Sequence, residues 1–240
     1  MNTQTTVDRI ELWLAPVAAT YAAAQLAAYE GLLDAEERTR WQRFHYAADR
    51  QRFLVGRAFM RNVLAANLGR RDPGGLLFTR TPHGKPELAG EDAGKLHFNL
   101  SHTDAMLVLA LSSRHEVGVD VEAVTRKVEM LALAERYFSA QEYGELLGMD
   151  GAAQRERFFA LWTLKEAWVK ARGLGLRIPL DAFRFDFAGA HPVVAFSPQL
   201  DAAPQDWQFR LLTHAQCRIA LAVHCAAAQP LQLRLREWSG

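Results

Sequence analysis

VGVDVE at residues 117–122 and WTLKEAWVK at residues 162–170 are the two stretches that decide how this chain is interpreted. The first predicts a buried strand, because β-branched valines alternate with other residues within short flanks. Since strand side chains alternate between faces, Asp120 and Glu122 point the same way. The second predicts a helix that carries Glu166 and Lys170, four residues apart, on one face. Three carboxylates beside an ammonium are what a divalent cation gripping substrate phosphates requires, which favours a phosphate-handling enzyme.

Each half of this pattern also has a simpler interpretation. Asp120 and Glu122 alone would more often be acids that meet solvent at a strand end. Glu166 and Lys170 alone would more often form a surface salt bridge on a helix, and helix tryptophans usually serve a core. The combination favours a site, because each of these alternatives would have to hold independently.

Composition describes an ordinary globular chain with room for one large domain or two modest ones. Of its 240 residues half are hydrophobic, and the formal net charge of +1 gives no global field for nucleic acid or membranes. Cys217 and Cys225 form no CxxC pair, so neither a disulfide framework nor a cysteine metal cluster is expected. The polar N-terminus lacks an apolar signal core and no stretch is apolar enough to span a bilayer, so a cytoplasmic protein is expected.

Charge is less even locally, because nine arginines and four acids fall between Asp34 and Arg71. Such a run is usually the solvated face of amphipathic helices, but an anion site stays open.

The order of predicted elements suggests two similar α/β modules. Helices are expected from Asp34 (as N-cap), at 50–68, 129–138, 140–147 (with Ser139 and Glu142 as a capping box) and 153–172. Strands are expected at 10–14, 76–79, 96–100, 106–111, 117–122, 183–187, 193–196, 207–212 and 218–225. No element is assigned to the tail. We expect a boundary at 112–115, which divides the chain into modules 1–113 and 114–240.

Two further motifs are weak individually. FNLSH at residues 98–102 ends a strand with Ser101 and His102, which could face an anion or simply begin a turn. A Ser-His-Asp hydrolase with Asp120 is disfavoured, because adjacent strand side chains diverge and no GxSxG elbow occurs. GKP at residues 84–86 predicts a tight turn, and no nucleotide-binding glycine loop is present.

Taken together, five motifs in this order resemble the phosphopantetheinyl transferases, in the larger monomeric form that activates surfactin synthetase. They are GKP (84–86), FNLSH (98–102), GVDVE (118–122), RYFS (136–139) and WTLKEAWVK (162–170). The resemblance implies two similar α/β modules in a pseudo-two-fold arrangement, an α/β (α+β) fold with the active site between them. It also implies a holo-[carrier protein] synthase reaction. In it, a serine of an apo acyl or peptidyl carrier protein takes the 4'-phosphopantetheine arm of coenzyme A and releases 3',5'-ADP.

The resemblance also implies roles for the acids. Asp120, Glu122 and Glu166 surround a Mg²⁺ ion, and Glu166 helps to deprotonate the incoming serine. Mg²⁺ takes few carboxylates and keeps positions for pyrophosphate oxygens, which agrees with this set. Lys170 completes the catalytic group with Asp120 and Glu166.

Coenzyme A is implied to contact basic and polar residues along the chain. Those matched to its phosphates and nucleotide are Arg40, Arg52, Lys85, Pro86, Ser101, His102 and Lys170, and Lys165 is expected to support the site. Arg40 and Arg52 fall where the family binds the 3'-phosphate. One departure is Glu37, which stands where a family lysine often does; Arg38 or Arg43 could substitute.

Two other classes of function compete. A non-catalytic carrier-binding protein would have lost the metal acids, and none is lost. A nucleic-acid binder could use the arginine run, but aromatic residues do not interleave with it as in stacking platforms. We therefore expect a monomeric enzyme that acts on carrier proteins, with no nucleic-acid or membrane partner.

Overall fold

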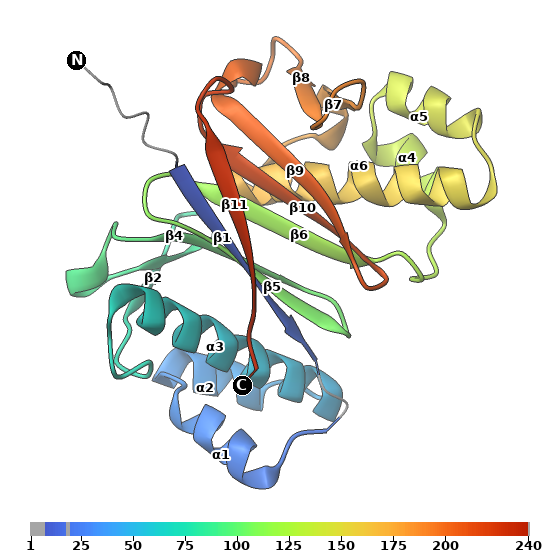
Figure 1. Cartoon of the computed structure of the whole chain (residues 1–240). Helices are drawn as coiled ribbons and strands as arrows, with labels where there is room; N and C mark the ends of the chain where they lie inside the picture. The colour runs from blue at the N-terminus through green and yellow to red at the C-terminus, as the bar shows by residue number, and fades with distance from the viewer. Residues whose placement is uncertain (1–7, 18–19, 240) are drawn as a thin grey trace, which may run out of the picture.

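The computed structural model describes residues 8–17 and 20–239 (Figure 1). Residues 1–7, the start of the polar N-terminal segment, lie outside the described residues. The first half contains β1 (Asp8–Pro16), α1 (Ala23–Gly31), α2 (Ala35–Gln42), α3 (Ala47–Leu68), β2 (Phe78–Arg80), β3 (Pro86–Leu88), β4 (His97–His102) and β5 (Met106–Ser112). The remainder contains β6 (Val117–Ala123), α4 (Met130–Tyr137), α5 (Ala140–Leu147), α6 (Gly151–Arg172), β7 (Phe183–Asp186), β8 (Val193–Phe196), β9 (Trp207–His214), β10 (Cys217–His224) and β11 (Leu231–Glu237).

The two halves repeat one topology. Each consists of a strand, three helices, a two-stranded hairpin and two further strands, and its three-stranded antiparallel sheet has the same order, β1-β5-β4 or β6-β10-β9. The third helix of each half, α3 or α6, has 22 residues and ends at a glycine in the left-handed conformation, Gly69 or Gly173. The prediction of two similar α/β modules is confirmed.

Local signals in the sequence account for two of the helix starts. Asp34 caps α2 by accepting a hydrogen bond from the Glu37 amide at 2.8 Å, and Glu37 closes the capping box. Ser139 and Glu142 form the second box, at the start of α5, as predicted.

The last strand returns to the first half. β11 pairs in parallel with β1, and the Trp238 ring lies 5.3 Å from the Phe59 ring in the core of the first half. The sequence patterns assigned no element to this tail, and the structure shows that it contains β11. The division after residue 113 stays a prediction, and β11 crosses it.

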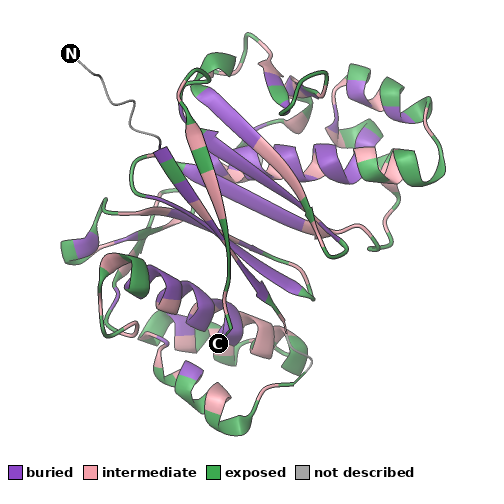
Figure 2. Ribbon diagram, in the orientation of Figure 1, coloured by how far each residue is buried: buried purple, intermediate pink, exposed green. Residues whose placement is uncertain are grey.

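The two sheets pack face to face, and helices cover their outer faces (Figures 1 and 2). β5 is buried throughout because it serves two cores: Leu107, Leu109 and Leu111 face α3, whereas Met106, Val108 and Ala110 face the other sheet. β6 also packs on both faces, and Val117, Val119 and Val121 lie between the sheets. The opposite face of β6 is therefore left to α6. Within the described residues, no helix is long and apolar enough to cross a membrane.

Candidate active site

The face of β6 that meets α6 carries Gly118, Asp120 and Glu122. A Cβ on Gly118 would lie 2.1 Å from the Ala167 carbonyl oxygen, so only glycine lets the helix approach this closely. Gly118 therefore allows the backbone of α6 to pack directly against β6. The Lys170 ammonium consequently lies 2.6 Å from Asp120 Oδ1.

Asp120 has hydrogen-bond partners on one carboxylate oxygen and none on the other. The carboxylate is 5 % exposed, and its Oδ1 also accepts a hydrogen bond from Ser101 Oγ at 3.0 Å. Lys170 donates to Ser101 Oγ as well, at 2.9 Å, so the three groups form a closed network. Asp120 Oδ2 is buried without a hydrogen-bond partner. Such an oxygen is costly unless a ligand completes its coordination.

The other two acids lie in the electrostatic field of Asp120. Burial raises the pKa of Glu166, and Asp120 and Glu122 raise it further while Lys170 opposes them. Burial also raises the pKa of Glu122, although its hydrogen bond from Arg126, at 2.8 Å, acts in the other direction. Two buried acids whose pKa values are raised beside a third carboxylate are typical of a site that binds a cation.

These residues fit a divalent cation. The unpartnered Asp120 Oδ2 supplies an oxygen ligand, and Glu122 and Glu166 supply two more carboxylates of the kind that Mg²⁺ prefers. In the described part of the chain the three acids are not among the groups whose ligand atoms all lie within 4.8 Å of one another. Arg126 donates to Glu122 at 2.8 Å, so Glu122 would exchange this partner for the ion.

Glu166→Gln should stabilise the metal-free protein, increasingly so as pH rises. A carboxyl with a raised pKa in the folded state contributes stability below the ordinary glutamate range, and this contribution is lost as pH rises through the raised pKa. Glutamine does not titrate, so the difference in Tm between variant and wild type should grow from about pH 4 to pH 8. Thermal unfolding in EDTA measures it, with Glu135→Gln on the exposed face of α4 as control. A difference that stays flat across this range would contradict the burial of Glu166.

A basic cavity of about 370 Å³ lies between α2, α3, the β2–β3 hairpin and β4. Its size falls within the range of ligand pockets, about 300–1,000 Å³. Four arginines and one acid line it, together with two phenylalanines and His102. These lining residues are Arg40, Phe44, Asp49, Arg52, Phe53, Gly56, Arg57, Met60, Arg80, Pro86, Leu100 and His102. The combination suits an aromatic ring that carries phosphates.

The structure thus brings together four residues predicted from the sequence, Arg40, Arg52, Pro86 and His102. Asp49 and Asp104 both accept hydrogen bonds from Arg52 and orient its guanidinium.

Sequence reasoning missed three important lining residues. The Phe53 ring lies between two guanidinium groups, with the Arg57 carbon 5.1 Å and the Arg40 carbon 5.5 Å from its centroid. Arg80 reaches the cavity from the hairpin. Four of the lining residues share one face of α3, because they have helical spacing: Phe53, Gly56, Arg57 and Met60. An arginine on that otherwise apolar face was the sequence signal that could have indicated the cavity.

His102 connects the cavity to the acids. Its ring lines the cavity, and it neighbours Ser101, which binds Asp120. Burial lowers the pKa of His102, and Arg52 from the cavity and Lys170 from the acid cluster lower it further. A neutral imidazole at this junction keeps one N–H donor for a phosphate oxygen.

Lys85 lies on the hairpin turn as expected but does not line the basic cavity. Its ammonium donates to the Ala171 carbonyl at 2.7 Å, near the C-terminal end of α6, and burial lowers its pKa. Lys85 lines a neighbouring cavity of about 510 Å³, and Pro86 is common to both cavities. It therefore ties the hairpin turn to the second half beside the basic cavity.

Three other residues have partners within the protein. Lys165 is fully buried, and its ammonium lies 2.8 Å from both a Glu142 oxygen and the Leu180 carbonyl, so it is not brought to the cavity. Glu37 binds the buried Arg61 at 2.7 Å, a structural ion pair. Arg38, the suggested substitute, pairs with Glu30 at 3.0 Å and is outside the cavity lining.

Comparison with protein families gives two matches that together span most of the chain. A family model described as the 4'-phosphopantetheinyl transferase superfamily matches residues 116–225. A second, described as 4'-phosphopantetheinyl transferase, N-terminal, matches residues 20–114. The second match contains the basic cavity and the first contains the acids.

Individual relatives agree. The 4'-phosphopantetheinyl transferase HetI of Nostoc sp. is 30% identical over 224 residues, 93% of this chain and 91% of HetI. The 4'-phosphopantetheinyl transferase Sfp of Bacillus subtilis is 33% identical over 155 residues, 65% of this chain and 66% of Sfp. The chain spans slightly less than two thirds of Sfp and of several other curated relatives.

Proposed function

Because the chain belongs to the 4'-phosphopantetheinyl transferase superfamily, we propose that it transfers the 4'-phosphopantetheine arm of coenzyme A to a carrier protein. The acceptor is a serine hydroxyl of an apo acyl or peptidyl carrier, the second product is 3',5'-ADP, and the reaction requires Mg²⁺. We propose further that the enzyme is a cytoplasmic monomer. The observation that carries the proposal is the position of His102, which lines the arginine cavity and lies close enough to Lys170 of the acid cluster for that charge to lower its pKa.

The cavity suits the nucleotide end of coenzyme A. Arg40, Arg52, Arg57 and Arg80 would bind phosphate groups, and a guanidinium fork matches the geometry of a phosphate dianion. Phe53 offers an aromatic face beside them. The pyrophosphate would then extend past His102 toward Lys170.

At the acid cluster the serine oxygen bonds to the β-phosphorus, the bond from that phosphorus to the 3',5'-ADP oxygen breaks, and the serine proton moves to a base. Glu166 is suited to take the proton, since burial and neighbouring acids raise its pKa. Asp120, Glu122 and Glu166 would hold Mg²⁺, which neutralises charge on the pyrophosphate. Lys170 and Ser101 keep the Asp120 carboxylate oriented.

Six of the nine arginines in the run pair with acids or line the cavity. Arg61 is buried against Glu37 and Asp34, Arg70 pairs with Asp92 at 2.9 Å, and Arg38 pairs with Glu30. Arg40, Arg52 and Arg57 converge on one cavity, which favours a small anionic ligand.

Arg52→Ala should weaken binding of coenzyme A and leave binding of 3'-dephospho-coenzyme A nearly unchanged. Loss of a charge-assisted hydrogen bond costs about 1.5–3 kcal/mol, or roughly 10- to 150-fold in Kd. Calorimetric titration of both ligands into wild type and variant measures the selectivity. Arg38→Ala, outside the cavity, should bind like wild type. Equal discrimination by Arg52→Ala and wild type would remove Arg52 from the 3'-phosphate.

The segment after Phe138 is a candidate surface for the carrier protein. From sequence it could equally be a docking patch or core; the structure places Phe138 and Leu146 in the core and leaves Leu147 55% exposed. Leu147→Asp should therefore raise KM for the apo carrier severalfold without changing Tm or coenzyme A affinity. Leu235→Asp on β11, 54% exposed in wild type, is the matched control. An unchanged KM in Leu147→Asp would exclude this part of the surface.

A further inference from the structure

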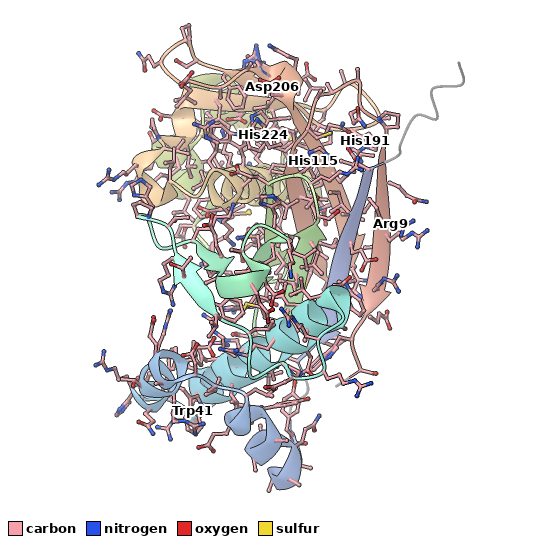
Figure 3. The ribbon with its side chains drawn as sticks, turned by 90° about the vertical axis from the view of Figure 1, so that its left-hand side faces the viewer. Arg9, Trp41, His115, His191, Asp206 and His224 are labelled. Atoms are coloured by element: carbon pink, nitrogen blue, oxygen red, sulfur yellow. The ribbon has the colours of Figure 1, made fainter. Side chains whose placement is uncertain are left out.

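Three chain segments meet at the N-terminal end of β6, whereas Asp120 and Glu122 lie toward its other end. They are the start of β1, the link between the two halves, and the connection from β10 to β11. From them, Asp8, His115 and Cys225 present donor atoms that all lie within 4.8 Å of one another. Asp8 and Cys225 are 6% and 5% exposed. Figure 3 shows His115 and His224 close together in the upper part of the molecule, well separated from Trp41 on α2.

His115 has an oxygen partner at each ring nitrogen. Its Nδ1 lies 3.2 Å from the His224 carbonyl oxygen. Its Nε2 lies 2.6 Å from Asp8 Oδ2, which also accepts a hydrogen bond from Gln229 at 3.3 Å. Nε2 and Oδ2 are therefore the two donor atoms that a cation would have to separate.

The surroundings are those of a metal-binding histidine. Such histidines usually donate their other ring N–H to a backbone carbonyl, and the His224 carbonyl oxygen lies 3.2 Å from Nδ1 here. Arg114 occupies the far oxygen of Asp8, Oδ1, at 3.0 Å, so Oδ2 is the oxygen directed at His115. The Gln208 amide donates toward Cys225 Sγ at 3.6 Å, whereas burial raises the pKa of this thiol, so a metal ion would have to displace its proton.

We propose that Asp8, His115 and Cys225 form a second metal site, for a thiophilic divalent cation of the Zn²⁺ class. Carboxylate, imidazole and thiolate are all zinc ligands, and three protein ligands leave one position for water. Zinc–ligand bonds of 2.0–2.3 Å in a tetrahedron place the donors about 3.3–3.6 Å apart, so Sγ must move closer and Nε2 must separate from Oδ2. The negative charges of the carboxylate and the thiolate together balance the two positive charges of the ion. The nearby Arg114 pairs with the other oxygen of Asp8.

A bound ion would hold together the start of β1, the link between the two halves and the connection from β10 to β11. It lies outside the arginine cavity and the acid cluster, and the inference does not depend on the proposed transferase activity.

Cobalt provides the most direct test, because a cobalt–thiolate bond has a charge-transfer band in the near ultraviolet. The full-length protein is stripped with EDTA, exchanged into chelator-free buffer and titrated with Co²⁺, and Zn²⁺ affinity is measured by competition with a chromophoric chelator. We expect the thiolate band to saturate at one equivalent of Co²⁺ and to disappear when Zn²⁺ displaces the cobalt. We also expect a higher Tm with Zn²⁺ bound.

Variants assign the ligands. Cys225→Ser should lose the thiolate band and His115→Ala should weaken Zn²⁺ binding at least tenfold. Cys217→Ser, which alters the other buried cysteine, should behave like wild type, and Asp120→Asn should leave Zn²⁺ binding unchanged. Absence of a thiolate band in wild type would overturn the proposal and leave His115 simply hydrogen-bonded to Asp8. Loss of the band in Cys217→Ser instead of Cys225→Ser would overturn it as well.

Discussion

Asp120→Asn is expected to lower kcat/KM for phosphopantetheine transfer by at least about 10³-fold, which corresponds to about 4 kcal/mol of transition-state stabilisation. Asparagine keeps the size of the side chain and an oxygen that can still accept from Ser101 and Lys170. It removes the charge and the free carboxylate oxygen, Oδ2, which is buried without a partner. The loss should therefore fall on catalysis, with a circular dichroism spectrum like that of wild type.

Transfer is measured by intact mass of the carrier protein at several Mg²⁺ concentrations. Glu122→Gln is the matched comparison on the same face of β6, and it should cost less, since Arg126 already engages Glu122 at 2.8 Å. Turnover close to wild type in Asp120→Asn at saturating Mg²⁺ would remove Asp120 from the metal site.

Gly118→Ala is expected to have the largest effect on stability. The added Cβ would lie 2.1 Å from the Ala167 carbonyl oxygen and 2.3 Å from the Ala171 nitrogen. Both atoms belong to the α6 backbone, so the helix must move away from β6. Overpacking of this kind costs on the order of 3 kcal/mol, and it would also separate Lys170 from Asp120.

Chemical denaturation measures this loss. Gly144→Ala provides the control, because a Cβ at that helical position meets nothing within 4 Å and alanine favours helix by up to about 1 kcal/mol. If Gly118→Ala unfolds at the same denaturant concentration as wild type, the close contact between β6 and α6 is not as described.

The sequence predicted most of the fold because hydrophobic periodicity is strong where elements pack on two cores. The valines of β6 and the continuous apolar run of β5 are direct consequences of burial on both faces. β11 was missed although Leu231, Leu233 and Leu235 alternate with polar residues, since nothing local indicates a partner as distant as β1. α1 was missed because no side chain caps its start and no acid precedes it.

The site was only partly predictable, for reasons of geometry. Lys165 adjoins Glu166 in sequence, but neighbouring helix positions diverge, so Lys165 faces Glu142 and the core whereas Glu166 and Lys170 lie toward Asp120. Ser101 and His102 likewise point to opposite sides of β4, toward Asp120 and toward the arginine cavity. Arg80 joins that cavity from the β2–β3 hairpin through tertiary packing, which spacing along the chain does not reveal.

The most direct test of the central claim is incubation of the protein with coenzyme A, Mg²⁺ and a panel of apo acyl and peptidyl carrier proteins, followed by intact mass measurement. We expect at least one carrier to gain the mass of a single 4'-phosphopantetheine on its acceptor serine, with an equal amount of 3',5'-ADP released and no reaction in EDTA. A folded protein that binds coenzyme A but modifies no carrier in the panel, with Mg²⁺ present, would contradict the assignment of this site as a transferase.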